Sequence, residues 1–224
     1  MKMMSILAVA ALAAGALTGT AAAGPEFGAS NYAGGNWGGY VSFGDFTTVT
    51  AGWTEPPVTC TSTDDLFAPW VGIDGDGSST VEQAGVATDC SSGSAVYQAW
   101  YEMYPAAPVY YDDPVSAGDK ITATVDRTGT NTYRLVINDT TKGWTRTVTK
   151  SLSARHSSAE AIIESPTDSY PAIDGGIRFT GVEFDGEPLA ATSPSALDAD
   201  DRGAYTWSPS AIASDGTGFT MTRH

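Results

Sequence analysis

Residues 95–104 read AVYQAWYEMY and alternate as a β-strand with two different faces requires. Successive side chains of a strand point to opposite faces of its sheet. One face is apolar and suited to a core, with Tyr97, Ala99, Tyr101 and Met103. The other is an aromatic surface with one carboxylate in it, formed by Val96, Gln98, Trp100, Glu102 and Tyr104. This second face fits a substrate-binding wall and equally a solvent-facing strand with chance aromatics, so both interpretations stay open.

Short runs of the same kind recur along the chain between clusters of Gly, Pro, Asn and Asp, and no apolar period of 3.6 residues persists over three turns. Strands are predicted at residues 37–43, 47–53, 70–74, 81–86, 95–104, 120–126, 132–138, 144–149, 160–164, 177–184 and 218–222. So many strands with regular turn signals predict an all-β chain folded as a two-sheet β-sandwich. The segment 187–203, rich in Ala, Ser, Pro and Asp, is predicted to be a surface excursion.

The first residues have the pattern of a secretory signal peptide. Lys2 precedes an apolar, alanine-rich stretch, and Ala21, Ala22 and Ala23 form a small-residue cleavage site. No apolar stretch approaches the roughly 20 residues that cross a bilayer as a helix. The sequence therefore predicts a signal peptide at residues 1–23, a short lead-in at 24–35 and a single secreted domain at 36–224.

Acidic residues far outnumber basic ones, with 26 Asp and Glu against 11 Lys and Arg and a formal charge of -15. Because nucleic-acid binding requires clustered basic side chains, a nucleic-acid partner is not expected. An anionic membrane surface is disfavoured for the same reason. Repulsion among carboxylates weakens as they protonate, which suits a protein that works in acid. A monomer is the default expectation.

Cys60 and Cys90 are the only cysteines. In an exported chain we expect a disulfide between them, and closing a loop of about 30 residues is worth roughly 3 to 4 kcal/mol. Two thiols are too few ligands for a metal site, so neither a metal nor a cofactor is expected.

The chain lacks the usual signatures of serine, zinc and aspartic hydrolases. His156 is the only histidine besides the terminal His224, and the GxSxG, HExxH, Asp-Thr-Gly and Asp-Ser-Gly patterns are absent. The acidic run WVGIDGDG at residues 70–77 does not follow the EF-hand pattern, because Ser79 and Gly85 stand where that loop needs Gly and Glu. If the chain is a hydrolase, a carboxylate must carry the chemistry.

Five segments resemble the glutamic peptidases, or eqolisins, in order and spacing: NWGGYV (36–41), WVGIDGDG (70–77), QAGV (83–86), YQAWYEMYP (97–105) and AEAIIES (159–165). The resemblance implies a concanavalin-like sandwich of two antiparallel sheets whose concave face holds a catalytic glutamine and glutamate, here Gln83 and Glu164. It further implies a secreted acid endopeptidase that acts on polypeptides and is insensitive to pepstatin.

The same resemblance assigns supporting roles by motif position. Trp70 and Asp74 match residues that orient the catalytic pair. The substrate cleft is implied to include Trp37, Trp100, Glu102 and Tyr104. One departure concerns Ala161, which stands where the family commonly has an aromatic residue and predicts an altered cleft floor. Glu160 lies at strand spacing from Glu164, but the motif places the function on the second glutamate.

The chemistry of this pair is consistent with work in acid. A carboxylate with a pKa near 4.3 stays partly ionised in mild acid, so Glu164 is expected to take a proton from water and pass it to the leaving amine. The amide of Gln83 cannot titrate and offers an N–H donor to the developing oxyanion. Two alternatives stay open, a non-catalytic carbohydrate-binding sandwich and a glycosidase that uses Glu102 and Glu164.

Overall fold

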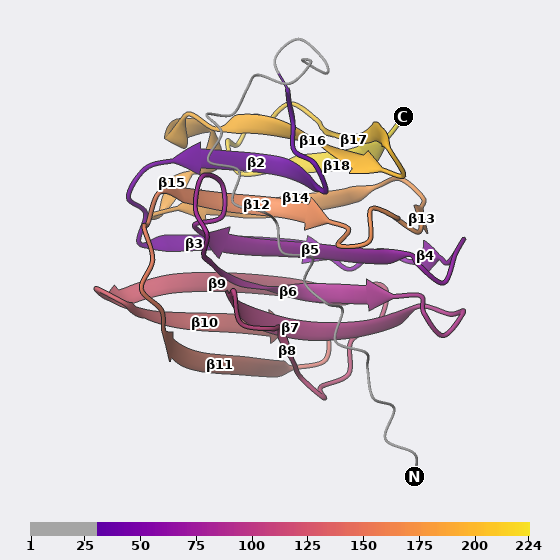
Figure 1. Ribbon diagram of the computed structural model, residues 1–224, viewed down its shortest axis with the longest axis horizontal. Helices are drawn as coiled ribbons and strands as arrows, with labels where there is room; N and C mark the ends of the chain where they lie inside the picture. Colours follow the sequence, from indigo (N-terminus) through magenta and orange to yellow (C-terminus); the bar gives the residue numbers. More distant parts are fainter. Residues whose placement is uncertain (1–30) are drawn as a thin grey trace.

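The computed structural model describes residues 31–224 and is built almost entirely from β-strands (Figure 1). The strands are β1 Tyr32–Ala33, β2 Trp37–Phe43, β3 Thr48–Thr54, β4 Val58–Thr59, β5 Leu66–Ile73, β6 Val81–Asp89, β7 Val96–Tyr104, β8 Val109–Tyr110, β9 Lys120–Gly129, β10 Thr132–Asp139, β11 Trp144–Ser151, β12 Ser158–Glu164, β13 Ala172–Ile173, β14 Ile177–Phe184, β15 Glu187–Pro188, β16 Ser195–Asp201, β17 Ala204–Pro209 and β18 Phe219–Arg223, with one 3-10 turn, η1, at Leu189–Thr192. None of the helical segments in this part of the chain has the length and apolar character needed to cross a membrane. The predicted signal peptide lies outside the described residues.

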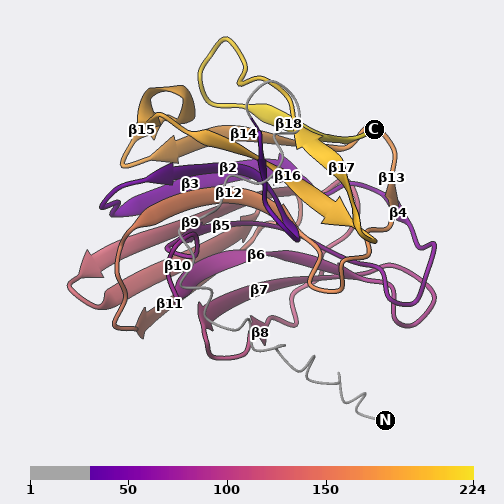
Figure 2. The same ribbon diagram turned by 45° about the horizontal axis from the view of Figure 1, so that its top comes forward.

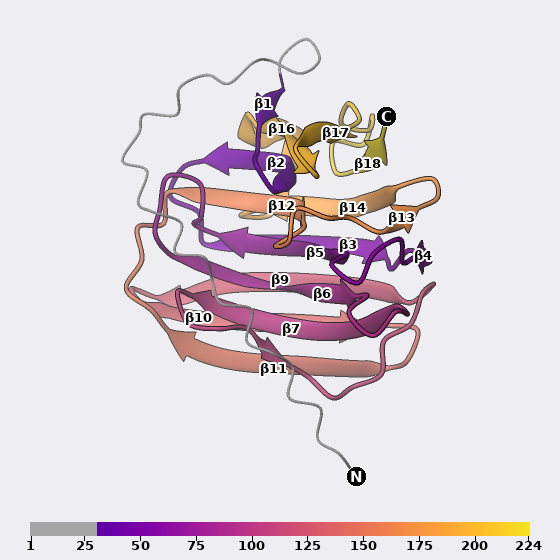
Figure 3. The same ribbon diagram turned by 45° about the vertical axis from the view of Figure 1, so that its right-hand side comes forward.

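The strands form two layers that join at one edge. The first layer has the order β16-β2-β12-β5-β6-β7-β8, and the second has the order β11-β10-β9-β3-β14-β18-β17. In Figure 3 the strands of the first layer lie in front of those of the second. Strand β16 belongs to both, because Ser195 to Leu197 pair with β2 while Ala199 to Asp201 pair with β17 (Figure 2). The all-β, antiparallel sandwich is confirmed; among the strands of residues 31–224, only the short strand β1 pairs in parallel, with β16.

The main core fills the space between the layers. Alternation along β12 sends Ala159, Ala161 and Ile163 inward, where they pack with buried residues of both layers. A second, smaller apolar cluster lies on the opposite face of the first layer, and it includes Val41, Trp70, Trp100, Ile162 and Leu197. The first layer is therefore apolar on both faces, and its outer face is free to carry a site.

Each predicted strand corresponds to a strand of the structure, with ends that differ by up to four residues. The prediction for residues 187–203 was wrong, because this segment contains β16 in the middle of the path that links the layers. Its acidic residues suggested exposure, yet Asp198 and Asp201 are buried. Partners compensate their burial: Asn31 donates to Asp198 at 2.8 Å, and Arg223 forms an ion pair with Asp201 at 2.6 Å.

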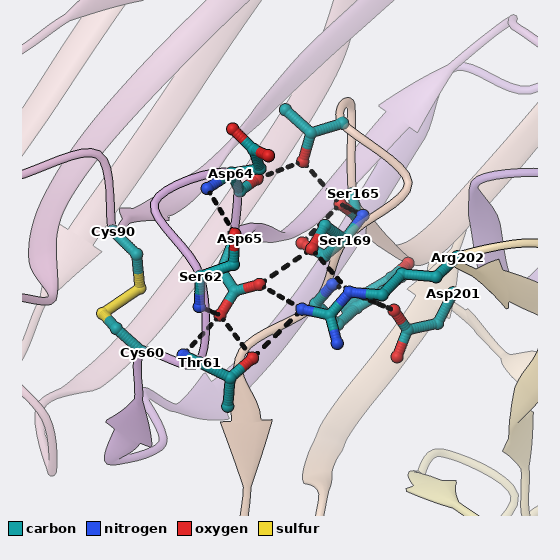
Figure 4. A network of polar contacts seen from close by, with 12 residues as sticks. Cys60, Thr61, Ser62, Asp64, Asp65, Cys90, Ser165, Ser169, Asp201 and Arg202 are labelled. Carbon is teal, nitrogen blue, oxygen red and sulfur yellow. Dashed lines mark hydrogen bonds and ion pairs between the residues drawn. A yellow bond between two sulfur atoms is a disulfide. The ribbon is translucent and has the colours of Figure 1, made fainter. Parts of the chain in front are cut away.

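Cys60 and Cys90 form the predicted disulfide, with their Cα atoms 5.6 Å apart. Next to it, a polar network fixes the segment that follows β12 (Figure 4). Ser165 Oγ donates to the carbonyl of Ser169, Ser169 Oγ donates to Asp65, and Arg202 pairs with the same carboxylate at 2.6 Å. Because Ser165 directly follows the end of β12, the network anchors the strand end that carries Glu164.

Candidate active site

The aromatic face predicted from residues 95–104 is the outer face of the first layer. Strand alternation and the second apolar cluster place the predicted site side chains on this face, from β2, β12, β5, β6 and β7: Trp37, Glu164, Trp70, Gln83, Trp100, Glu102 and Tyr104. The face is thus neither solvent-exposed by chance nor part of the main core. The strand therefore does not present chance aromatics to solvent; its binding role stays a prediction.

A glycine on β6 leaves space for the large side chains on the neighbouring strands β5 and β7. Gly85 on β6 pairs with Trp70 on β5 and with Trp100 on β7. A Cβ atom at Gly85 would lie 2.3 Å from the carbonyl oxygen of Pro69 and 2.7 Å from Cβ of Trp70. Only glycine fits there, so Gly85 allows the two tryptophans to lie on either side of it in one row across the sheet.

The carboxyl group of Glu164 is held by donors on both oxygens. Trp70 Nε1 donates to Oε2 at 3.0 Å, and Asn36 Nδ2 donates to Oε1 at 2.9 Å. Trp37 pairs with Glu164 across β2 and β12, and its ring packs edge-on against that of Trp70 with centroids 4.8 Å apart. Asn36 and Trp70 thus hold the two carboxyl oxygens, and Trp37 supports Trp70 by packing against its ring.

Burial raises the pKa of Glu164 to about 7, although hydrogen bonds from Trp37, Trp70 and Asn36 act in the opposite direction. The charge of Glu102 adds to the increase. The expectation that Glu164 is partly ionised in mild acid was therefore wrong, because it used the pKa of a solvated carboxylate. In this site the protonated carboxyl is the main form throughout the acid range.

Asn36 is a site residue that the sequence analysis did not single out. Its backbone carbonyl accepts hydrogen bonds from the hydroxyl of Tyr170 at 3.0 Å and from the amide of Ser165 at 3.2 Å. Its side chain is thereby aimed at Glu164. A signal was available, since Asn36 is the first residue of the NWGGYV segment.

Gln83 lies beside Glu102 on the neighbouring strand, and its Nε2 donates to Glu102 Oε2 at 2.6 Å. Gln83 is only 5% exposed, and burial raises the pKa of Glu102 to about 7. Glu102 also raises the pKa of Glu164 through charge repulsion. A hydrogen bond and a charge interaction thus connect Gln83, Glu102 and Glu164 into one cluster that can both move a proton and donate an amide N–H.

Asp74 binds a loop rather than the catalytic pair that its motif position implies it orients. Its carboxylate accepts hydrogen bonds from the backbone amides of Arg155, His156 and Ser157 at 2.8 to 3.1 Å. Among the described residues it makes no hydrogen bond with Gln83 or Glu164. Asp74 instead holds the loop that leads into the start of β12, at the opposite end of that strand from Glu164.

Ala161 does not lie on the cleft floor. It belongs to the inner face of β12 and packs in the main core, opposite Tyr40 of β2. The expectation of an altered cleft floor was wrong, because strand alternation gives that face to Glu160, Ile162 and Glu164. Glu160 shares the face but is completely buried, and burial raises its pKa well above the ordinary value.

The rim of this face contains one exposed residue that was not predicted. Tyr110 on β8 pairs with Trp100 of β7 and is 38% exposed, whereas Val109 pairs with Tyr101 and so lies on the other side of the sheet. Burial raises the pKa of Tyr110, and the nearby charges of Glu102, Asp89 and Glu164 add to the increase. The short strand β8 therefore extends the aromatic surface to the edge of the sheet.

A model of the peptidase A4 family matches residues 35–217, which include every residue of the cluster just described. The chain belongs to the peptidase A4 family. It is a glutamic-type peptidase, as the resemblance of its five segments implied. This membership decides against the carbohydrate-binding and glycosidase alternatives.

Similarity to individual proteins of this kind supports the assignment. The peptidase is 29% identical over 201 residues to aspergillopepsin-2 of Aspergillus niger, an alignment that covers 75% of this chain and 71% of that protein. It is 36% identical over 138 residues to scytalidopepsin B of Scytalidium lignicola, covering 58% of this chain and 51% of the relative. A crystal structure of scytalido-glutamic peptidase with a peptide-based transition state analog superposes with a TM-score of 0.71 at 25% identity, covering 84% of this chain and 98% of that one.

Proposed function

We propose that this peptidase hydrolyses internal peptide bonds of polypeptides in acid, with Gln83 and Glu164 as its catalytic pair. The observation that carries the proposal is the placement of Glu164. Its two carboxyl oxygens are bound by Asn36 and Trp70, on the same face as Gln83 and Glu102. A face that carries both a fixed carboxyl and an amide supplies the two functions that amide hydrolysis needs.

Glu164 enters the reaction protonated, because burial keeps its pKa at about 7. It gives this proton to the nitrogen of the leaving amine and takes a proton from the water that adds to the carbonyl carbon. The C–N bond breaks, a C–O bond forms, and the carboxyl regains its starting state. Asn36 and Trp70 keep the carboxyl in place during both transfers.

Gln83 stabilises the negative charge that develops on the carbonyl oxygen as water adds. An amide N–H does not titrate, so it remains a donor at every acidic pH. One preorganised donor of this kind accelerates hydrolysis by about 10²- to 10³-fold.

The substrate cleft of the proposal is the aromatic outer face, with Trp37, Trp100, Glu102 and Tyr104 as contacts for the peptide. Aromatic side chains supply large apolar contact areas. Trp100 is almost buried while Tyr104 is half-buried, so Trp100 forms the floor and Tyr104 the wall. The related scytalido-glutamic peptidase was crystallised with a peptide-based analog, which supports a peptide as the ligand of this face.

The proposal includes export of the peptidase from the cell before it cleaves its substrate. Residues 1–23 have the pattern of a signal peptide, residues 24–35 are a lead-in and residues 36–224 are the catalytic domain. The Cys60–Cys90 disulfide supports this assignment, because such bonds persist in oxidising compartments. The sheet itself already begins at β1, within the end of the lead-in.

The direct test is cleavage of an unfolded protein substrate by the purified enzyme at about pH 4, with pepstatin present. We expect internal fragments to accumulate at the same rate with and without the inhibitor, because the site has no pair of catalytic aspartates. Mass spectrometry of the fragments identifies the cut bonds. Complete inhibition by pepstatin, or an intact substrate at every pH from 3 to 7, would show that the proposal is wrong.

A further inference from the structure

The side-chain amide of Gln83 is bound at one end only. Its Nε2 donates to Glu102 at 2.6 Å, whereas its Oε1 is buried and has no hydrogen-bond partner among the described residues. The arrangement therefore presents an unpaired acceptor next to the place where the proposed reaction needs a donor.

The protonation state of Glu102 decides which end of the amide it can bind. An ionised carboxylate only accepts hydrogen bonds, so it holds the NH₂ group, as in the structure. A protonated carboxyl also donates an O–H, for which the amide oxygen of Gln83 is a matching acceptor. Turning the amide about its last side-chain bond exchanges the two ends, so that both N–H donors become free of Glu102.

We propose that Glu102 is the positioning residue of Gln83: its protonated carboxyl binds Gln83 Oε1 and turns the NH₂ group toward the peptide carbonyl. The inference rests on the proposed function and deepens it, because it gives Glu102 a role beyond contact with the substrate. The ionised form of Glu102 holds Gln83 in the opposite, unproductive orientation.

The surroundings of Glu102 favour its protonated form in acid. Gln83 lies between Gly72 of β5 and Glu102 of β7, so β5 offers no competing charge at this position. Among the described residues, the other titratable groups on this face are carboxyls and phenols: Glu164 and Glu160 on β12, Asp89 at the end of β6, Tyr104 on β7 and Tyr110 on β8. Burial in this setting raises the pKa of Glu102 to about 7.

Two separate protons are then needed for activity, one on Glu164 and one on Glu102. Loss of either proton as the pH rises stops the reaction. Above both pKa values kcat/KM of the wild type should fall by about 100-fold per pH unit, since two groups must each be protonated. The variant Glu102→Gln no longer needs a proton at position 102, because its side-chain amide donates to Gln83 Oε1 at every pH.

The first measurement is independent of activity and follows the side-chain amide of Gln83 by NMR between pH 4 and 7.5. Its two ¹H–¹⁵N resonances are identified by their loss in Gln83→Ala. We expect them to shift with pH in the wild type and in Glu160→Gln, and to stay constant in Glu102→Gln. Resonances that do not titrate in the wild type, or that titrate equally in Glu102→Gln, would overturn the inference.

The second measurement compares the shape of the kcat/KM profiles rather than their height. Circular dichroism at each pH restricts the comparison to folded enzyme. We expect the slope at high pH to fall from about 100-fold to about tenfold per pH unit in Glu102→Gln, and to be unchanged in Glu160→Gln. Equal slopes in all three would contradict the inference. Absence of cleavage by the wild type refutes the proposed function instead, and leaves the NMR result to decide the role of Glu102.

Discussion

Replacing Glu164 by Gln is expected to lower kcat/KM by at least about 10²- to 10⁴-fold at every acidic pH, because the amide cannot pass a proton between water and the leaving amine. The substitution keeps the shape of the side chain. It also keeps an oxygen that can accept from Trp70 or Asn36, which hold the carboxyl in the wild type. The fold should therefore remain, and the loss should appear in kcat. Steady-state hydrolysis of an unfolded protein or a peptide, with a thermal melt of each variant, checks this.

Glu160→Gln is the matched control for this variant. Glu160 lies on the same strand and the same face, four residues away, but it is completely buried and outside the proposed machinery. We expect its kcat/KM to stay within about threefold of the wild type. If Glu160→Gln lost its activity while Glu164→Gln kept it, Glu160 rather than Glu164 would be the catalytic glutamate.

Raising the pH from 5 to 8 is expected to destabilise the fold strongly. Burial raises the pKa of Glu55 and of Glu82 to about 8 and that of Glu160 well above the ordinary value of 4.5. Glu55 accepts hydrogen bonds from Trp53 and Thr88, but these offset only part of the cost of burying its charge. Asp74 adds to the increase at Glu82 by repulsion.

The direction follows from where each state releases its protons. The unfolded chain ionises near pH 4.5, whereas the folded chain keeps these protons until about pH 8. Stability is therefore fully present below about pH 4.5 and falls as the pH rises, by about 1.4 kcal/mol per pH unit for each such group. Repulsion within a chain of formal charge -15 acts in the same direction.

Thermal unfolding between pH 4 and pH 8 tests this prediction. We expect the melting temperature to fall continuously across that range, and Glu160→Gln to fall less steeply because one of the buried protons is no longer titratable. A melting temperature that stays level from pH 4 to pH 8 would be inconsistent with carboxyls that are buried as neutral groups.

Strand period and motif order were sufficient to predict the sandwich and most of the site face. Alternation alone placed Trp100, Glu102 and Tyr104 on one side of β7, and the structure agrees. The path through β16 could not be predicted in the same way. Its buried aspartates depend on partners distant in sequence, such as Arg223 for Asp201, which local composition does not reveal.

The pKa values of the site residues also could not be predicted from the sequence. The pKa of Glu164 depends on burial by strands from several parts of the chain, so its residue type suggested a more acidic group than the fold produces. The contact of Asn36 with Glu164 joins residues 128 positions apart. Similarly, the inward direction of Ala161 follows from the register of β12, which the motif comparison did not consider.

The most direct test of the central claim, that Gln83 and Glu164 act together on one reacting peptide bond, is a double-mutant cycle. It measures kcat/KM at about pH 4 for wild type, Gln83→Ala, Glu164→Gln and the double variant. Residues that act as a unit are strongly non-additive. We predict that kcat/KM falls by at least about 100-fold in each single variant. In the double variant it should fall no more than about threefold below the less active of the two single variants. Losses that multiply, or a single variant with wild-type activity, would contradict the account.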